Sequence, residues 1–226
     1  MTFVYKTLLA IIPVLLLLGY IYCKGNGKSI PFKQLMWAFW TCFLFPLEYF
    51  TNLLDDTGIY VDNYQTTSEE LWKMFITGAC AEEILKFIIL CLILKVFHFD
   101  GRYRIVIVSA FIGLGFACSE NLLYIYTSDN WLFLSIMRAV LSVPNHFSYA
   151  IIMGCLYFFA QHNGKTRGIL YALALIIPIC LHWLDNAIIM VPELDGWDFI
   201  LAPVCSIMLF VFADRLIKKV REESGM

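Results

Sequence analysis

The chain has 226 residues, of which 61% are hydrophobic and 15% are charged, with a net charge of −2 and a mean hydropathy of +0.75. A soluble domain has roughly a quarter charged residues and about half apolar ones, so this composition indicates an integral membrane protein. No basic patch suggests a nucleic-acid partner. The eight cysteines lie within or beside apolar stretches without a CxxC pair, which argues against a disulfide framework.

Seven apolar stretches follow one another, each with the roughly 20 residues that a membrane-spanning helix needs. They cover about residues 2–23, 32–50, 70–97, 103–127, 131–160, 167–191 and 197–220. The first is too long for a signal peptide and lacks a cleavage site, so we expect it to be retained. Pro144 is expected to kink the fifth. The predicted fold is all-α: a polytopic helical bundle of about seven transmembrane helices, one domain over residues 1–226, multi-pass in the cell membrane.

The charges of the connecting loops predict the orientation of these spans. Basic residues gather in every second loop and at the end of the chain: Lys24, Lys28, Lys33, Lys95, Arg102, Arg104, Lys165, Arg167, Arg215, Lys218, Lys219 and Arg221. The other loops are acidic, and the longest of them covers residues 51–70. By the positive-inside rule the N-terminus lies outside and the C-terminus is cytoplasmic.

Six ionisable side chains inside different spans are predicted to lie at similar depths: Glu82, Glu83, Glu120, Arg138, His146 and His182. The helix rise of about 1.5 Å per residue places five of them in the outer half of the bilayer and His146 near its middle. Charges within a membrane usually face the interior of a bundle or a water-filled cavity. Several spans that carry polar groups at one depth therefore predict one shared site.

These residue types permit two kinds of hydrolysis. A glutamate in an apolar cavity can act as a general base toward water, while Lys86, at i+4 and i+3 from the two glutamates, neutralises one of them. Asn186 follows His182 by one turn and can help to stabilise an oxyanion, and Asp185 is a supporting partner or points elsewhere. Alternatively, a zinc ion could be held by Glu83, Glu120, His146 and His182, although no HExxH motif is present.

Four motifs in order resemble the PrsW family of intramembrane proteases, distant relatives of the CAAX prenyl endopeptidases in the Abi family. They are AEEILKF, GLGFACSENLLY with Phe116 and Asn121, the RAVLSVPNHFSYAIIMG stretch, and LHWLDN. The match covers about residues 70–190, which we take as the catalytic core. The resemblance implies that Glu82 or Glu83 activates water, that Glu120, His146 and His182 complete the site, and that a membrane-tethered protein such as an anti-sigma factor is cut on its extracytoplasmic side.

The sequence therefore predicts a glutamic-type intramembrane peptidase without a cofactor, with a zinc-dependent mechanism as the alternative. Glu83 is the preferred base and Glu82 the second choice. Neighbouring residues on a helix point about 100° apart, so both glutamates cannot face the cavity equally. Asn121 is expected to satisfy backbone groups of a neighbouring helix. The substrate would be a single-span membrane protein in the bilayer. Two other functions fit the same residues: a proton- or cation-coupled transporter, and a non-catalytic membrane receptor or chaperone.

Overall fold

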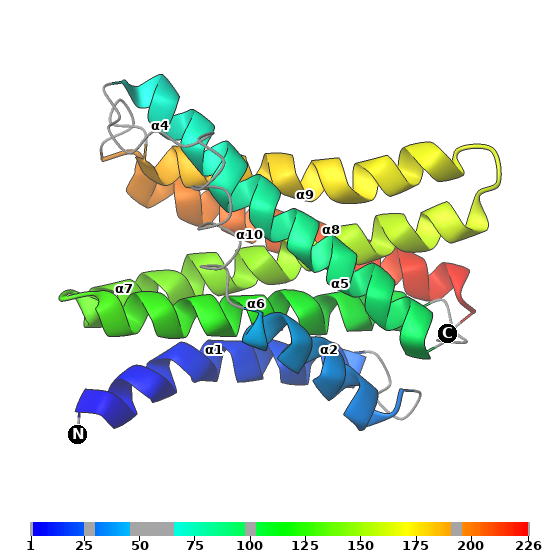
Figure 1. Cartoon of the computed structure of the whole chain (residues 1–226), viewed down its shortest axis with the longest axis horizontal. Helices are drawn as coiled ribbons and strands as arrows, with labels where there is room; N and C mark the ends of the chain where they lie inside the picture. The colour runs from blue at the N-terminus through cyan, green and yellow to red at the C-terminus, as the bar shows by residue number, and fades with distance from the viewer. Residues whose placement is uncertain (1, 25–29, 46–65, 98–102, 191–195, 226) are drawn as a thin grey trace.

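The computed structural model describes residues 2–24, 30–45, 66–97, 103–190 and 196–225, and the secondary structure of these residues is helical throughout (Figure 1). The elements in chain order are α1 (Thr2–Lys24), α2 (Phe32–Leu44), α4 (Thr67–Lys73), η2 (Met74–Cys80), α5 (Ala81–Phe97), α6 (Arg104–Thr127), α7 (Trp131–Met137), η3 (Arg138–Ser142), α8 (Val143–His162), α9 (Arg167–Met190) and α10 (Asp198–Glu223). The predicted all-α bundle is confirmed.

Five of the predicted spans correspond to helices that are long and apolar enough to cross a membrane: Thr2–Lys24, Arg104–Thr127, Trp131–His162, Arg167–Ile189 and Asp198–Glu223. The second predicted span corresponds to α2, which has 13 residues and ends at Leu44. The third is helical from α4 through η2 and α5, and it carries the charged residues of the AEEILKF motif. The end of the second span and most of the acidic loop fall outside the described residues. The orientation of the termini stays a prediction.

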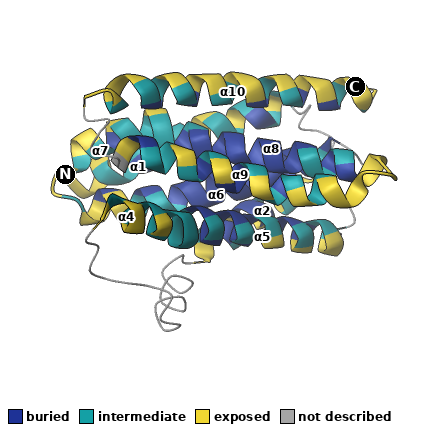
Figure 2. Ribbon diagram, turned by 90° about the horizontal axis from the view of Figure 1, so that it is seen from above, coloured by how far each residue is buried: buried dark blue, intermediate teal, exposed yellow. Residues whose placement is uncertain are grey.

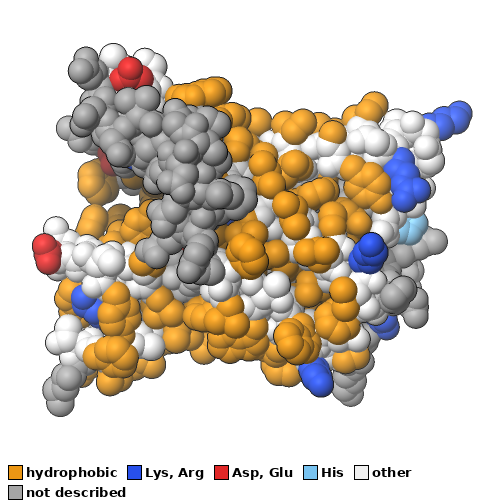
Figure 3. All heavy atoms as spheres, viewed as in Figure 1, with side chains coloured by type: hydrophobic (Ala, Val, Ile, Leu, Met, Phe, Trp, Pro, Cys, Tyr) orange, Lys and Arg blue, Asp and Glu red, His pale blue; other side chains and the backbone are white. Residues whose placement is uncertain are grey.

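Two helices, α6 and α8, form the centre of the bundle (Figure 2). α6 packs against α1, α2 and α8, and α8 packs in addition against α9 and α10. The outer helices expose many large apolar side chains, which are spread over the middle of the face in Figure 3, while the charged side chains lie toward its edges. Exposed apolar surface of this extent suits helices that are surrounded by lipid, where no water has to be excluded.

Two glycines of α6 allow this helix to pack closely against α8 and α2. A Cβ atom on Gly113 would lie 2.8 Å from the backbone oxygen of His146 in α8. A Cβ atom on Gly115 would collide with the backbone carbonyl of Phe39 in α2. Small residues of this kind let helix backbones pack tightly inside a membrane. Gly113 therefore brings α6 directly against the turn of α8 that carries His146.

Both π-helical segments lie immediately before residues of the predicted site. η2 ends at Cys80, two residues before Glu82, and η3 ends at Ser142, two residues before Pro144. Pro144 has no N–H to donate to the preceding turn, and the widened turn of η3 lies directly before it, while the kink expected at Pro144 stays a prediction. Single π-helical turns often occur at functional sites, because they rotate the residues that follow them.

Candidate active site

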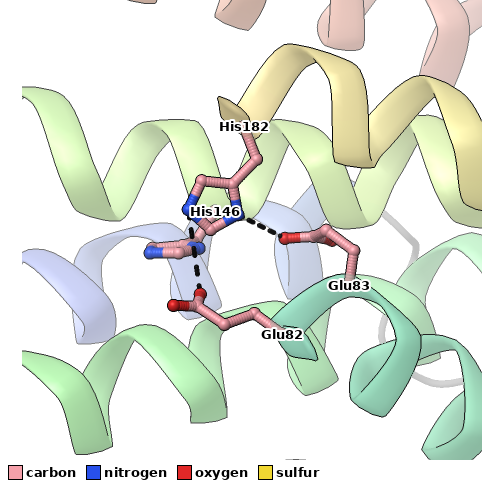
Figure 4. A group of neighbouring side chains, drawn as sticks. All are labelled: Glu82, Glu83, His146 and His182. Carbon is pink, nitrogen blue, oxygen red and sulfur yellow. Dashed lines mark hydrogen bonds and ion pairs between the residues drawn. The ribbon is translucent and has the colours of Figure 1, made fainter. Parts of the chain in front are cut away.

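Four buried side chains from three helices meet in the middle of the bundle (Figure 4). Glu82 and Glu83 come from α5, His146 from α8 and His182 from α9. Each offers one potential metal-ligand atom, and these atoms all lie within 4.8 Å of one another. The polar residues that the sequence places at similar depths on separate spans are thus brought together in space.

Glu83 is held by two donors. Lys86 Nζ donates to Glu83 Oε1 over 2.6 Å, and His182 Nδ1 lies 3.0 Å from the same oxygen. Neither Lys86 nor Glu83 has any exposed side-chain surface. The ammonium group also lies 4.1 Å from the centre of the Phe116 ring, a cation–π contact. Lys86 therefore neutralises Glu83, one of the two pairings that its spacing allows.

The hydrogen bonds of the two histidines fix which nitrogen of each carries the proton. Lys86 Nζ lies 3.0 Å from His146 Nδ1, and because an ammonium group can only donate, Nδ1 must accept. His146 Nε2–H then donates to Glu120 Oε2 over 2.8 Å. For His182 the order is reversed, since its Nδ1–H donates to the Glu83 carboxylate. His182 Nε2 then keeps a lone pair that no other described residue engages in a hydrogen bond.

Glu82 is the less constrained of the two neighbouring glutamates. Its Oε2 atom is buried without a hydrogen-bond partner, and Lys86 Nζ and His182 Nε2 each lie 3.8 Å from it. The free oxygen of Glu82 and the free nitrogen of His182 thus face each other at a separation that exceeds a direct hydrogen bond. A water molecule between them could donate a hydrogen bond to each.

A second polar group joins α6 to η3 beside this cluster. Arg138 Nη2 donates to Glu120 Oε2 over 2.7 Å, and Arg138 Nε donates to Asn121 Oδ1 over 2.7 Å. Asn121 Nδ2 in turn donates to the backbone oxygen of Ala10 in α1 over 3.2 Å, which is the backbone role expected for it. Arg138 is thus paired within the bundle, and Glu120 both pairs with it and fixes His146.

The sequence analysis missed two residues that support the histidines. Tyr149 is buried and stacks on the His182 ring, with centroids 5.1 Å apart, while its edge contacts the His146 ring. Its hydroxyl donates to Asp185 Oδ2, which also accepts from Asn145 Nδ2 over 2.7 Å. Asp185 is thus a supporting residue that reaches the site through Tyr149. The available signal was spacing, because Tyr149 lies at i+3 from His146 and at i+4 from Asn145 on one helix.

Asn186 lies at the edge of the cluster. A Cβ atom on Gly78 in η2 would be 3.5 Å from Asn186 Nδ2, so the amide rests against the backbone of η2. Gly78 lies one turn before Glu82 on the same continuous helix. The Asn186 amide is therefore packed against the turn that precedes the two glutamates.

The central cluster fits a zinc ion in its donor types, because zinc in proteins takes histidine nitrogens and carboxylate oxygens. Glu82 Oε2 and Glu83 Oε2 are buried without hydrogen-bond partners, and the lone pair of His182 Nε2 is free. His146 is the fourth member, although Lys86 and Glu120 engage both of its nitrogens. Glu120, which the sequence suggested as a ligand, is already bonded to Arg138, and Glu82 takes its place in the group.

Comparison with known proteins connects this geometry to a family. The profile described as "PrsW family intramembrane metalloprotease" matches residues 30–213. The chain is 34% identical to Protease PrsW of Clostridioides difficile (strain 630), over 93% of this chain and 90% of the relative. It is 27% identical to Protease PrsW of Bacillus subtilis (strain 168), over 96% and 95% of the two chains. No solved structure is significantly similar to it.

Proposed function

The chain belongs to the PrsW family of intramembrane proteases, and from this premise we propose that it cleaves single-span membrane proteins with water activated by Glu82. Membership of the family makes it a multi-pass membrane peptidase that acts on membrane proteins in the bilayer. The catalytic residues and the type of mechanism are our proposal.

One observation carries the choice of Glu82. The site has three carboxylates and two permanent cations, and each cation donates a hydrogen bond to one carboxylate, while Lys86 also lies 3.8 Å from Glu82. Lys86 is bonded to Glu83, and Arg138 to Glu120. Glu82 Oε2 has no hydrogen-bond partner and faces the free nitrogen of His182. This pairing reverses the order of preference that the sequence suggested, in which Glu83 came first.

In the proposed reaction a water molecule donates hydrogen bonds to Glu82 Oε2 and to His182 Nε2. Glu82 removes a proton as the water oxygen attacks the scissile carbonyl, and it later returns this proton to the departing amine. Glu83 holds His182 in the required tautomer through Nδ1–H, as carboxylates commonly do for catalytic histidines. Asn186 is the proposed donor to the oxyanion, because it follows His182 by one turn of α9 and its amide lies against Gly78 of η2, one turn before Glu82.

The zinc-dependent form of this mechanism uses the same residues. Glu82, Glu83 and His182 would hold the ion with atoms that are free of hydrogen bonds, and His146 would join them after releasing Lys86. Bound zinc would supply Lewis-acid activation of water and of the scissile carbonyl. The role of Lys86 differs between the two forms, since its ammonium group occupies His146 Nδ1 only in the metal-free arrangement.

We propose that the substrate is cut on its extracytoplasmic side, and an anti-sigma factor with one membrane span is the class that the family resemblance suggests. The acidic loops beside the outer ends of the predicted spans support this orientation. Three of the polar residues, Glu120, Arg138 and His182, lie within about three turns of those ends.

The test is a cleavage assay with purified protein and single-span substrates that include an anti-sigma factor. Wild type, Glu82→Gln, Glu83→Gln and His182→Ala are compared with and without a strong chelator. Loss of cutting in Glu82→Gln with full activity in chelator supports activation by Glu82 alone. Loss in chelator with recovery on adding zinc supports the metal form. Cutting by Glu82→Gln at the wild-type rate would refute the assigned role.

A further inference from the structure

A cavity with an excess of positive charge lies between α1 and α10, outside the candidate active site. It has a volume of about 500 Å³. Its charged lining residues are Lys24 at the end of α1 and Asp214, Arg215 and Lys218 in the last turns of α10. Three cations against one carboxylate leave two positive charges without an acidic partner in the lining. The cavity therefore favours an anionic ligand.

The network at the base of the cavity fixes the position of Lys24. Its Nζ donates to the Tyr20 hydroxyl over 2.7 Å and pairs with Asp214, which also accepts from Tyr20. Lys218 Nζ lies 3.2 Å from the other oxygen of Asp214. An ammonium group has three donors, so Lys24 and Lys218 each keep at least one for a further acceptor.

Arg215 lines the same cavity and makes no hydrogen bond or ion pair with any other described residue. A guanidinium group presents five N–H donors in a planar fork, and this fork matches the oxygens of a phosphate group. Arg215 is therefore the lining residue with the most unused capacity for an anion.

One face of α10 changes from apolar to basic at this cavity. Val204, Ile207, Met208 and Val211 follow the i, i+3, i+4, i+7 spacing of a single helix face, and each is between 44% and 67% exposed. Arg215 and Lys218 continue the same face at i+4 and i+7 from Val211. A phospholipid has the same order of groups, with apolar acyl chains that end in a charged phosphate.

We propose that this cavity binds the headgroup of an anionic phospholipid, with its phosphate held by Arg215, Lys218 and Lys24. Its acyl chains lie along the exposed apolar face of α10. Basic pockets between transmembrane helices are known to recognise anionic headgroups. A free phosphate ion would use only the basic end, whereas the phospholipid uses the whole face. The bound lipid would connect α1 to α10, which approach each other through Tyr20 and Phe210.

The test measures lipid binding to the purified protein by native mass spectrometry. Phosphatidylglycerol and phosphatidylcholine with identical acyl chains are titrated, so that only the headgroup differs. Wild type is expected to prefer phosphatidylglycerol. Each removed charge is expected to weaken that preference about fivefold, so Arg215→Gln with Lys218→Gln should weaken it about 25-fold. The matched control is Lys95→Gln with Lys165→Gln, two basic residues that lie outside the cavity.

Three outcomes would overturn the proposal. The control pair may reduce the preference as much as the cavity pair, which would indicate general surface attraction. Wild type may bind both lipids equally. Inorganic phosphate may displace phosphatidylglycerol from the protein at equal concentration, which would indicate an ion site without a lipid. If the double variant melts at a lower temperature than wild type in neutral lipid, the single variant Arg215→Gln is tested in its place. This single variant should weaken the preference for phosphatidylglycerol about fivefold.

Discussion

Replacement of Lys86 by methionine tests the central ion pair of the site most directly. The change keeps an unbranched side chain that is one atom shorter, and it removes the positive charge. Glu83 would lose its 2.6 Å partner and would remain as a buried carboxylate with His182 alone, and His146 Nδ1 would lose its donor. Breaking a buried ion pair by removing one partner costs about 3–5 kcal/mol. We expect Lys86→Met to lower the free energy of unfolding by that amount.

A double-mutant cycle separates this pair from other effects of the substitution. Glu83→Gln removes the charge that Lys86 would leave unpaired, so the two changes together should cost at least about 2 kcal/mol less than the sum of the single changes. Unfolding is measured in mixed micelles by titration with a denaturing detergent. Lys95→Met, at an exposed position on the same helix, is the control and should stay within about 0.5 kcal/mol of wild type. Additive single costs would refute the pairing.

Three further predictions concern the supports of the site. Tyr149→Phe keeps the ring stack on His182 but loses the hydroxyl contact to Asp185. Its cleavage rate should fall about tenfold, and its free energy of unfolding should fall by only about 1 kcal/mol. Tyr149→Leu also loses the ring stack, so its cleavage rate should fall further. Gly113→Ala should cost about 1–3 kcal/mol by forcing α6 from α8, whereas a similar change at Gly168, which has open space around it, should cost nothing. Elemental analysis of the purified protein distinguishes the two forms of the mechanism. The metal form requires zinc in wild type and its loss in His182→Ala, whereas the metal-free form requires wild type without zinc.

The sequence could predict which polar residues lie close together, because the depth of a residue in the membrane follows from the helix rise and from the ends of the apolar stretches. Glu82 and Glu83 come from one span and His182 from another, 99 residues after Glu83, yet matching depths implied one cavity. The pairing of Lys86 also followed from spacing alone, since i+3 and i+4 residues are neighbours on a helix. The i+3 partner, Glu83, is the one that forms the short contact.

The order of the two glutamates could not be predicted in the same way. The rotation of a residue on a helix depends on every turn that precedes it, and η2 widens the turns just before Glu82. A regular helix drawn from the sequence therefore cannot decide which of the two residues keeps its carboxylate free of a cation. The contact of Tyr149 with His182 was hidden for a related reason, because it requires α8 and α9 to be packed with a known rotation, whereas its contact with His146 lies within α8.

The charges of the site explain why three carboxylates are tolerated at the centre of an apolar bundle. An unpaired carboxylate in such surroundings is costly, and the fold offsets two of the three with Lys86 and Arg138. A purely structural network would be expected to pair the third as well. Glu82 has Lys86 only at 3.8 Å, and its Oε2 atom lies opposite His182 Nε2 without a hydrogen bond. The role as base that we propose for Glu82 requires the neutral variant Glu82→Gln to lose cleavage while its stability is preserved or raised.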